Sequence, residues 1–136
     1  MDYLLDTMTL SYVIDGNKLV SGRLKAAATS GAVYTSVISE GELTYGALRL
    51  GTERRRELLN EISLLLNDLA GVVPVTRAVA SLYGAIKRDL GATGQLIPAN
   101  LLWIASVAVE RDYALIAHDR HFDQVKGLRV EDWLEP

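Results

Sequence analysis

The segment Met1-Asp2-Tyr3-Leu4-Leu5-Asp6-Thr7 decides how the chain folds, because it joins a short apolar run directly to a carboxylate. Open α/β sheets bind their ligands outside the carboxyl ends of the strands, which is the position expected for Asp6. Two later segments are expected to bring further acids to the same edge: Ser39-Glu40-Gly41-Glu42-Leu43 and Leu115-Ile116-Ala117-His118-Asp119. We therefore interpret Asp6 as the first member of an acidic, metal-binding cluster.

Short apolar runs and helical patterns alternate along the chain. The apolar runs predict strands at residues 3–5, 32–35, 72–75, 114–117 and 128–130. Because these runs are brief and do not alternate with polar residues, they suit strands buried on both faces of a parallel sheet. Helical patterns occupy residues 7–15, 18–28, 38–50, 52–69, 77–90 and 98–111. This order predicts right-handed βαβ crossovers and an α/β fold. We expect a three-layer α/β/α sandwich with a short central parallel sheet, formed as a single domain by residues 1–136.

Glycine, threonine and proline residues are expected to mark several helix ends. Gly16 should end the first helix, and Gly51 should cap the carboxyl end of the third. Thr52 is expected to cap the fourth helix, and Gly91 to follow the end of the fifth. Pro98 suits the first turn of the last helix.

The composition is that of a soluble globular domain. Of the 136 residues, 49% are hydrophobic and 23% are charged, which argues against a disordered chain. The absence of cysteine excludes disulfide scaffolds, zinc–thiolate sites and thiol nucleophiles. No segment approaches the roughly 20 apolar residues that a membrane-spanning helix needs. We therefore expect a cytoplasmic protein.

Two short basic runs are the candidates for contact with a nucleic acid. The net charge of −3 does not itself indicate such binding, but affinity for phosphate depends on local basic patches. The runs are Arg54-Arg55-Arg56 and Lys87-Arg88. We favour the alternative that both are exposed helix faces in water.

Asp6, Glu42 and Asp119 are the candidate metal ligands. Carboxylates gathered at one sheet edge repel one another unless a cation neutralises them, and hard ions such as Mg²⁺ and Mn²⁺ prefer oxygen ligands. Each acid also has a structural alternative. Asp6 is a good cap for the helix that follows it, and Asp119 is a turn-forming residue before Arg120. Glu42 fits a capping box with Ser39 equally well.

The other polar residues near these acids are assigned to the surface. Glu40 lies on the opposite side of the helix from Glu42 and is interpreted as solvated. His118 and His121 are interpreted as polar loop residues rather than catalytic groups.

Four motifs together resemble the PIN domain, and within that family the VapC-type toxins of bacterial and archaeal toxin–antitoxin pairs. The resemblance covers essentially the whole chain, in order and at normal spacing. Its residues are Leu4-Leu5-Asp6-Thr7 with Leu10-Ser11-Tyr12, Ser36-Val37-Ile38-Ser39 through Glu42-Leu43, Ile97-Pro98-Ala99-Asn100 with Leu102-Trp103-Ile104-Ala105, and His118-Asp119-Arg120-His121-Phe122 with Gly127-Leu128.

The resemblance implies an endoribonuclease that depends on Mg²⁺ or Mn²⁺ and cleaves structured RNA such as tRNA or rRNA. It also implies a homodimer and inhibition by a small VapB-like antitoxin. Asp6, Glu42 and Asp119 fall on three of the four acidic positions of the family, which makes them the expected catalytic and metal-binding residues.

The chain departs from the family pattern where the fourth acid is expected. Asn100 is followed by Leu101 in place of an aspartate, and Met8 and Ala117 stand where asparagine and a hydroxyl residue are common. Leu101 should extend an apolar helix face, so we predict higher stability, weaker metal binding and weak or absent ribonuclease activity.

Two other interpretations compete with the ribonuclease. One is a catalytically inactive PIN-fold protein, either naturally degenerate or redesigned, that acts only as a dimer and antitoxin-binding module. The other is a phosphate-accepting receiver-like domain. It is disfavoured because Asp2 lies too early to pair with Asp6, and because the late strand is followed by Asp119 where a lysine is needed.

Overall fold

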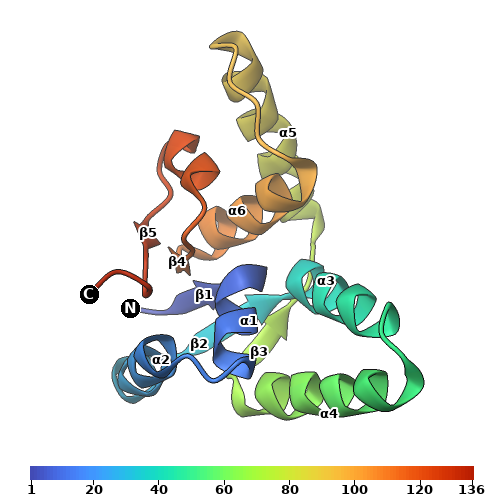
Figure 1. Cartoon of the computed structure of the whole chain (residues 1–136). Coiled ribbons are helices and arrows are strands. Elements are labelled where there is room, and N and C mark those ends of the chain that lie inside the picture. The colour runs from blue at the N-terminus through green and yellow to red at the C-terminus, as the bar shows by residue number, and fades with distance from the viewer.

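The computed structural model describes all 136 residues and contains one sheet of five parallel strands in the order β3-β2-β1-β4-β5 (Figure 1). The strands are β1 (Tyr3–Leu5), β2 (Val33–Ser36), β3 (Gly71–Val73), β4 (Ala114–Ile116) and β5 (Val130–Glu131). The helices are α1 (Thr7–Ile14), α2 (Lys18–Ser30), α3 (Val37–Leu48), α4 (Thr52–Asp68), α5 (Arg77–Ala92) and α6 (Ala99–Arg111), with a 3-10 turn η1 (Arg120–Gln124). The predicted α/β class and parallel sheet are confirmed.

Helices cover both faces of the sheet, and each face has its own apolar core. Side chains alternate between the two faces of a strand, so Leu4 and Leu5 of β1 point into different cores. Leu4 packs with residues of α5, α6, β4 and η1, including the fully buried Phe122. Leu5 packs with residues of α1, α2, α3 and α4. Figure 1 shows these two helical layers on either side of the strands, which is the expected three-layer sandwich.

β1 is the central strand and fixes the position of Asp6. It pairs in parallel with β2 on one side and β4 on the other, with Leu5 opposite both Thr35 and Ile116. The backbone N–H of Asp6 continues this ladder by donating to the carbonyl of Ile116 at 3.1 Å. Asp6 therefore lies at the middle of the carboxyl edge of the sheet.

The predicted elements are all present, but several predicted helix ends are wrong. Helix α3 ends at Leu48, and Gly51 precedes α4 as its amino-terminal cap rather than closing α3. Thr52 is the first residue of α4, which has no side-chain cap. Helix α5 continues through Gly91 to Ala92. Gly16 follows α1 with a φ of +82°, a conformation that favours glycine, so the stop expected there is confirmed.

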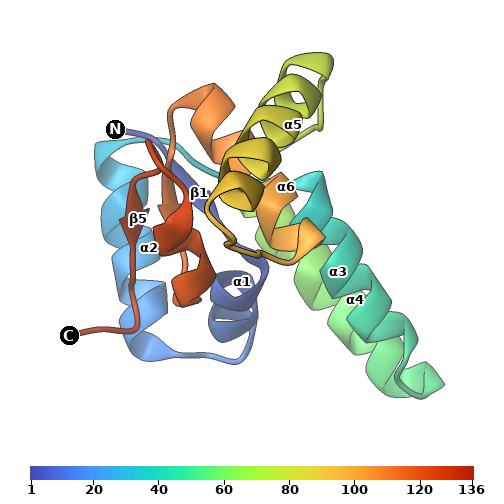
Figure 2. The same cartoon turned by 90° about the horizontal axis from the view of Figure 1, so that it is seen from above.

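Helices α3 and α4 run side by side and project together from the body of the molecule (Figure 2). Arg55 joins them at their connection. Its Nη2 donates to the carbonyl of Leu48 at 3.0 Å and to the carbonyl of Leu50 at 3.1 Å. The last carbonyls of a helix have no partner within the helix, so this guanidinium satisfies the end of α3. Arg54 instead forms an exposed ion pair with Glu57 on its own helix.

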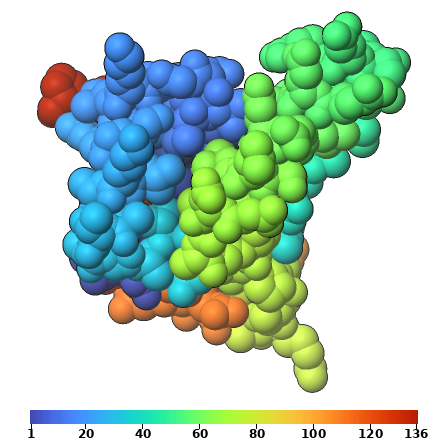
Figure 3. Space-filling model, turned by 90° about the horizontal axis from the view of Figure 1, so that it is seen from below, coloured from blue at the N-terminus to red at the C-terminus, as the bar shows by residue number.

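A hollow of about 610 Å³ lies between α2 and α4 at the opposite edge of the sheet from Asp6. Its walls include Leu24 of α2, Leu65 of α4 and the start of β2 at Val33. Figure 3 shows this side of the molecule, with α2 in light blue beside α4 in green.

None of the helices combines the length and apolar character that a bilayer crossing requires.

We expect Arg55→Ala to lower the free energy of unfolding by about 1–3 kcal/mol, because it leaves two carbonyls without their charged donor. The matched variant Arg54→Ala removes an exposed ion pair and should cost less than about 0.5 kcal/mol. Urea unfolding of both variants checks this difference. Equal losses would contradict a structural role particular to Arg55.

Candidate functional site

Asp6 is a buried carboxylate at the junction of β1 and α1. Only 2% of the residue is exposed, and its Oδ1 accepts a hydrogen bond from the backbone N–H of Thr9 at 2.9 Å. This bond caps α1, so the structural role expected for Asp6 is confirmed. The side chain of Thr9 in turn donates to the carbonyl of Ile116 at 3.0 Å, which ties α1 to β4.

The surroundings of Asp6 raise its pKa from 3.8 to about 6. Burial is the main cause, because it penalises the charged form, and the hydrogen bonds from Thr9 oppose it. The negative charges of Asp119 and Glu42 raise the pKa further. Asp119 and Glu42 are therefore both close enough for their charges to act on the buried carboxylate of Asp6.

Glu42 points from α3 toward the residue that follows Asp6. Its Oε1 accepts from the Thr7 hydroxyl at 2.6 Å, and its Oε2 accepts from Nδ2 of Asn100 at 2.8 Å. The hydroxyl of Thr7 also contacts the Ser39 hydroxyl at 3.0 Å. The side chain of Glu42 thus bridges α1 and the start of α6.

The capping-box alternative for Glu42 is wrong. Helix α3 begins at Val37, and its cap is Ser36, whose hydroxyl accepts from the backbone N–H of Ser39 at 3.2 Å. Ser39 is therefore a residue of the first turn and not the cap. The carboxylate of Glu42 instead accepts hydrogen bonds from Thr7 and Asn100 near the carboxyl edge of the sheet.

Asp119 follows β4 and caps η1. Its Oδ1 accepts from the backbone N–H of His121 at 2.8 Å and lies 2.7 Å from Nδ1 of the same histidine. These contacts, the backbone hydrogen bond first, hold the pKa of Asp119 below its usual value despite partial burial. Asp119 has the turn role expected for it, and the His121 ring is its immediate neighbour rather than an isolated surface group.

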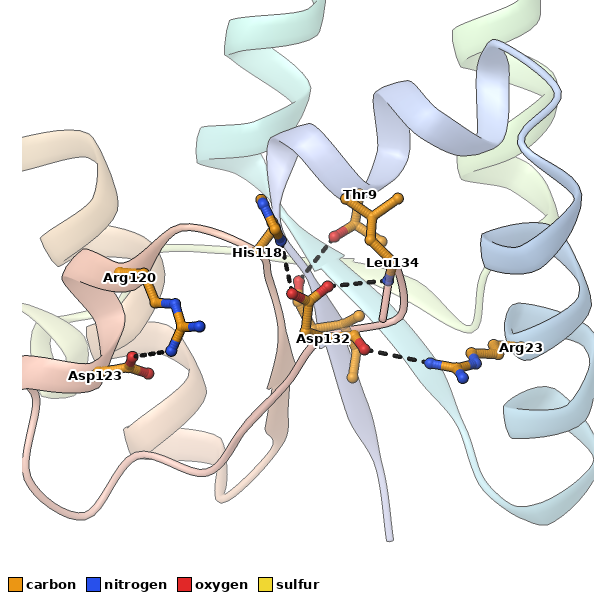
Figure 4. Close-up of polar contacts among 8 residues, drawn as sticks. Thr9, Arg23, His118, Arg120, Asp123, Asp132 and Leu134 are labelled. Carbon is orange, nitrogen blue, oxygen red and sulfur yellow. Dashed lines mark hydrogen bonds and ion pairs between the residues drawn. The ribbon is translucent and has the colours of Figure 1, made fainter. Parts of the chain in front are cut away.

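The loop beside Asp119 contacts Asp132, near the carboxyl end of the chain. Nδ1 of His118 lies 2.6 Å from Oδ2 of Asp132, whose Oδ1 accepts from the backbone N–H of Leu134 at 2.9 Å. Arg23 of α2 donates to the carbonyl of Asp132 at 3.3 Å. Figure 4 shows these contacts converging on Asp132 beside the end of β4.

The three positions that depart from the family pattern have different environments. Leu101 is half-buried and packs against the core that contains Ile104, Ala105 and Ala108, as the apolar helix face predicts. Ala117 is buried at the end of β4, whereas Met8 is 53% exposed on α1.

The basic runs are engaged mainly with their own helices. Arg55 closes the α3–α4 connection, and Arg54 pairs with Glu57. Arg88 pairs with its neighbour Asp89, and the Lys87 ammonium lies 5.6 Å from the ring centre of Tyr83.

The site contains two polar residues whose roles the sequence did not reveal, Thr7 and Asn100. Both contact Glu42 from elements that are distant from α3 in the sequence. The position of Thr7 directly after Asp6 was the available signal, because it places the hydroxyl at the same strand end. As the side chains lie here, no three acidic or histidine residues form a ready-made metal centre.

Comparison with known proteins agrees with this architecture over nearly the whole chain. "Ribonuclease VapC1" of Haemophilus influenzae (strain R2866) is 27% identical over 135 residues, which is 98% of each chain. "tRNA(fMet)-specific endonuclease VapC" of Shigella flexneri is 28% identical over 134 residues, again 98% of each chain.

Solved structures of toxin–antitoxin complexes share the fold. The VapBC-1 structure from nontypeable Haemophilus influenzae superposes with a TM-score of 0.87 at 26% identity, covering 99% of this chain and 100% of the other. The VapBC2 structure from Rickettsia felis, bound to a promoter DNA fragment, gives a TM-score of 0.91 at 24% identity and covers 98% and 99% of the two chains. The family model for the PIN domain matches residues 3–128, and this chain therefore belongs to the PIN domain family.

Proposed function

We propose that this chain is a VapC-type endoribonuclease that depends on a divalent metal ion, with Asp6, Glu42 and Asp119 as its catalytic and metal-binding residues. One observation carries the proposal. The pKa of a buried carboxylate at the centre of the sheet's carboxyl edge is raised by burial and by two further acids, within a chain whose full-length relatives are named as ribonucleases.

The donor set fits a hard divalent cation, Mg²⁺ or Mn²⁺. It consists of carboxylate oxygens without sulfur, and the mutual repulsion at Asp6 is the kind that a cation relieves. The hydrogen bond to Asp6 engages Oδ1, which leaves Oδ2 as a donor. When bound, such an ion supplies Lewis-acid chemistry that activates water and stabilises charge on a phosphodiester.

The chain's own residues keep the carboxylates in place. Thr9 holds Asp6 at the end of β1, and His121 holds Asp119 at the start of η1. Thr7 and Asn100 engage the two oxygens of Glu42. Each carboxylate is thus oriented by its own hydrogen bonds, and the three side chains would have to draw closer together to hold one cation.

Leu101 is proposed to weaken this activity. It places an aliphatic side chain at the start of α6, where the family pattern has a fourth acid, and packing against the core holds it there. The alternative of an inactive dimer and antitoxin-binding module is not favoured, because the relatives that match the full chain carry ribonuclease names.

The proposed partners follow from the same comparisons. A VapB-like antitoxin is proposed because the matching structures are toxin–antitoxin complexes. RNA, either tRNA or rRNA, is the proposed substrate, and one relative is named as a tRNA endonuclease. A homodimer acting in the cytoplasm completes the proposal.

Incubation of total RNA with the purified chain and Mg²⁺ or Mn²⁺ tests the activity. We expect slow cleavage that Asp6→Asn abolishes and that Leu101→Asp raises about 10-fold or more, because the added acid completes the ligand set. Leu96→Asp, at an 84% exposed position in the loop before α6, is the control for an added negative charge. No metal-dependent cleavage by either the parent or Leu101→Asp would refute the ribonuclease proposal. Fast cleavage that Leu101→Asp leaves unchanged would refute the impairment.

The raised pKa of Asp6 predicts a pH-dependent stability in metal-free buffer. Because the folded state holds this proton more tightly than the unfolded state, the free energy of unfolding should fall as the pH rises from about 4 to about 6. Above that window the ionised carboxylate costs about 2–3 kcal/mol. Asp6→Asn should therefore stabilise the protein by about this amount at pH 7.5 and by little at pH 4.

Urea unfolding with EDTA at several pH values measures this difference. Asp123→Asn, which alters an exposed aspartate of η1, is the control and should leave the pH profile unchanged. An Asp6→Asn effect that is the same at pH 4 and pH 7.5 would contradict the assignment of the raised pKa to Asp6.

A further inference from the structure

Asn100 makes a contact that its position at the start of a helix does not require. Helix α6 begins at Ala99, its cap is Pro98, and no side chain caps its amino end. The amide of Asn100 instead reaches Glu42, which is 58 residues away in the sequence, with 2.8 Å between Nδ2 and Oε2. This is a tertiary contact between two helices that belong to different layers of the sandwich.

The carboxylate of Glu42 is held from both sides. Thr7 donates to Oε1 from α1, and Asn100 donates to Oε2 from α6. Hydrogen bonds to an ionised carboxylate are short and strong, and two of them on separate oxygens fix both the rotamer and the plane of the group. Without Asn100, the carboxylate of Glu42 could rotate while keeping its hydrogen bond to Thr7.

The next residue, Leu101, makes the contact of Asn100 more important in this chain. Leu101 is directed into the core and brings no charge to the site. Asn100 is therefore the residue through which the start of α6 reaches the acidic cluster. Its amide is neutral, so it orients Glu42 without adding another negative charge to the repulsion that already raises the pKa of Asp6.

We propose that Asn100 is a positioning residue for Glu42, holding the second oxygen of that carboxylate so that it faces the metal site. This inference rests on the proposed function. Asn100 acts through Glu42 and is not itself assigned as a ligand. The contribution of Asn100 to metal binding therefore depends on the presence of the Glu42 carboxylate.

A double-mutant cycle read by Mn²⁺ affinity tests this dependence. Electron paramagnetic resonance of free Mn²⁺ is used to titrate the full chain, Asn100→Ala, Glu42→Ala and the double variant. We expect Asn100→Ala to weaken binding about 10-fold, as is typical when the support of a ligand is lost. In the Glu42→Ala background, Asn100→Ala should cause no further loss.

Asn60→Ala is the matched control, because Asn60 is an exposed asparagine on α4 that makes no hydrogen bond to Glu42. It should leave Mn²⁺ affinity unchanged, and Asn100→Ala should match it in thermal stability, since the Asn100 contact is exposed. These two comparisons separate positioning from a general loss of structure.

Unchanged Mn²⁺ affinity in Asn100→Ala would overturn the inference while leaving the metal site intact. An equal loss with and without Glu42 would overturn it as well, because Asn100 would then act independently as a ligand. Absence of saturable Mn²⁺ binding by the parent chain would overturn the proposed metal site, and the inference would fail with it.

Discussion

The burial of Leu4 and Leu5 of β1 on opposite faces of the sheet is the constraint on which the rest of the structure depends. Leu4 and Leu5 are fully buried, each in a different core, and strands lie on both sides of them. A strand held in this way cannot slip by one residue without exchanging its two faces. Asp6, which follows this strand, is therefore fixed in position and buried, although a carboxylate is better solvated in water. Asp6 is placed by this packing, and the burial that results raises the pKa of its carboxyl group.

The strand pattern and the edge of the sheet where Asp6 and Asp119 lie could be predicted from the sequence, because both depend on local order. Tyr3–Leu5 and Ala114–Ile116 are short apolar runs, and the acids that follow them come to one edge as soon as the strands are parallel. The helix ends were less predictable. Gly51 suits either the end of one helix or the start of the next, and the choice is made by Arg55, which satisfies the end of α3 from the following helix.

The orientation of Glu42 could not be predicted, because two arrangements were equally compatible with its spacing from Ser39. The structure decides between them through contacts with Thr7 and Asn100, which lie 35 and 58 residues away. The sequence of α3 alone does not indicate these contacts, because both partners lie outside that helix. The environment of Leu101, unlike the orientation of Glu42, could be predicted. Its role in packing follows from its spacing with Ile104 and Ala105, so its environment was predictable although its effect on chemistry is not visible in the fold.

The bridge at Glu42 has a mechanical consequence. Thr7 belongs to the helical layer on one side of the sheet, and Asn100 to the layer on the other side. One carboxylate therefore links the two helical layers at the carboxyl edge of the sheet, through one hydrogen bond to each. Close-packed interiors transmit displacement rather than absorbing it, so a change in the spacing of the two layers alters this bridge directly. A substitution in either core that changes this spacing should therefore alter the hydrogen bonds of Glu42, even though Glu42, Thr7 and Asn100 are unchanged.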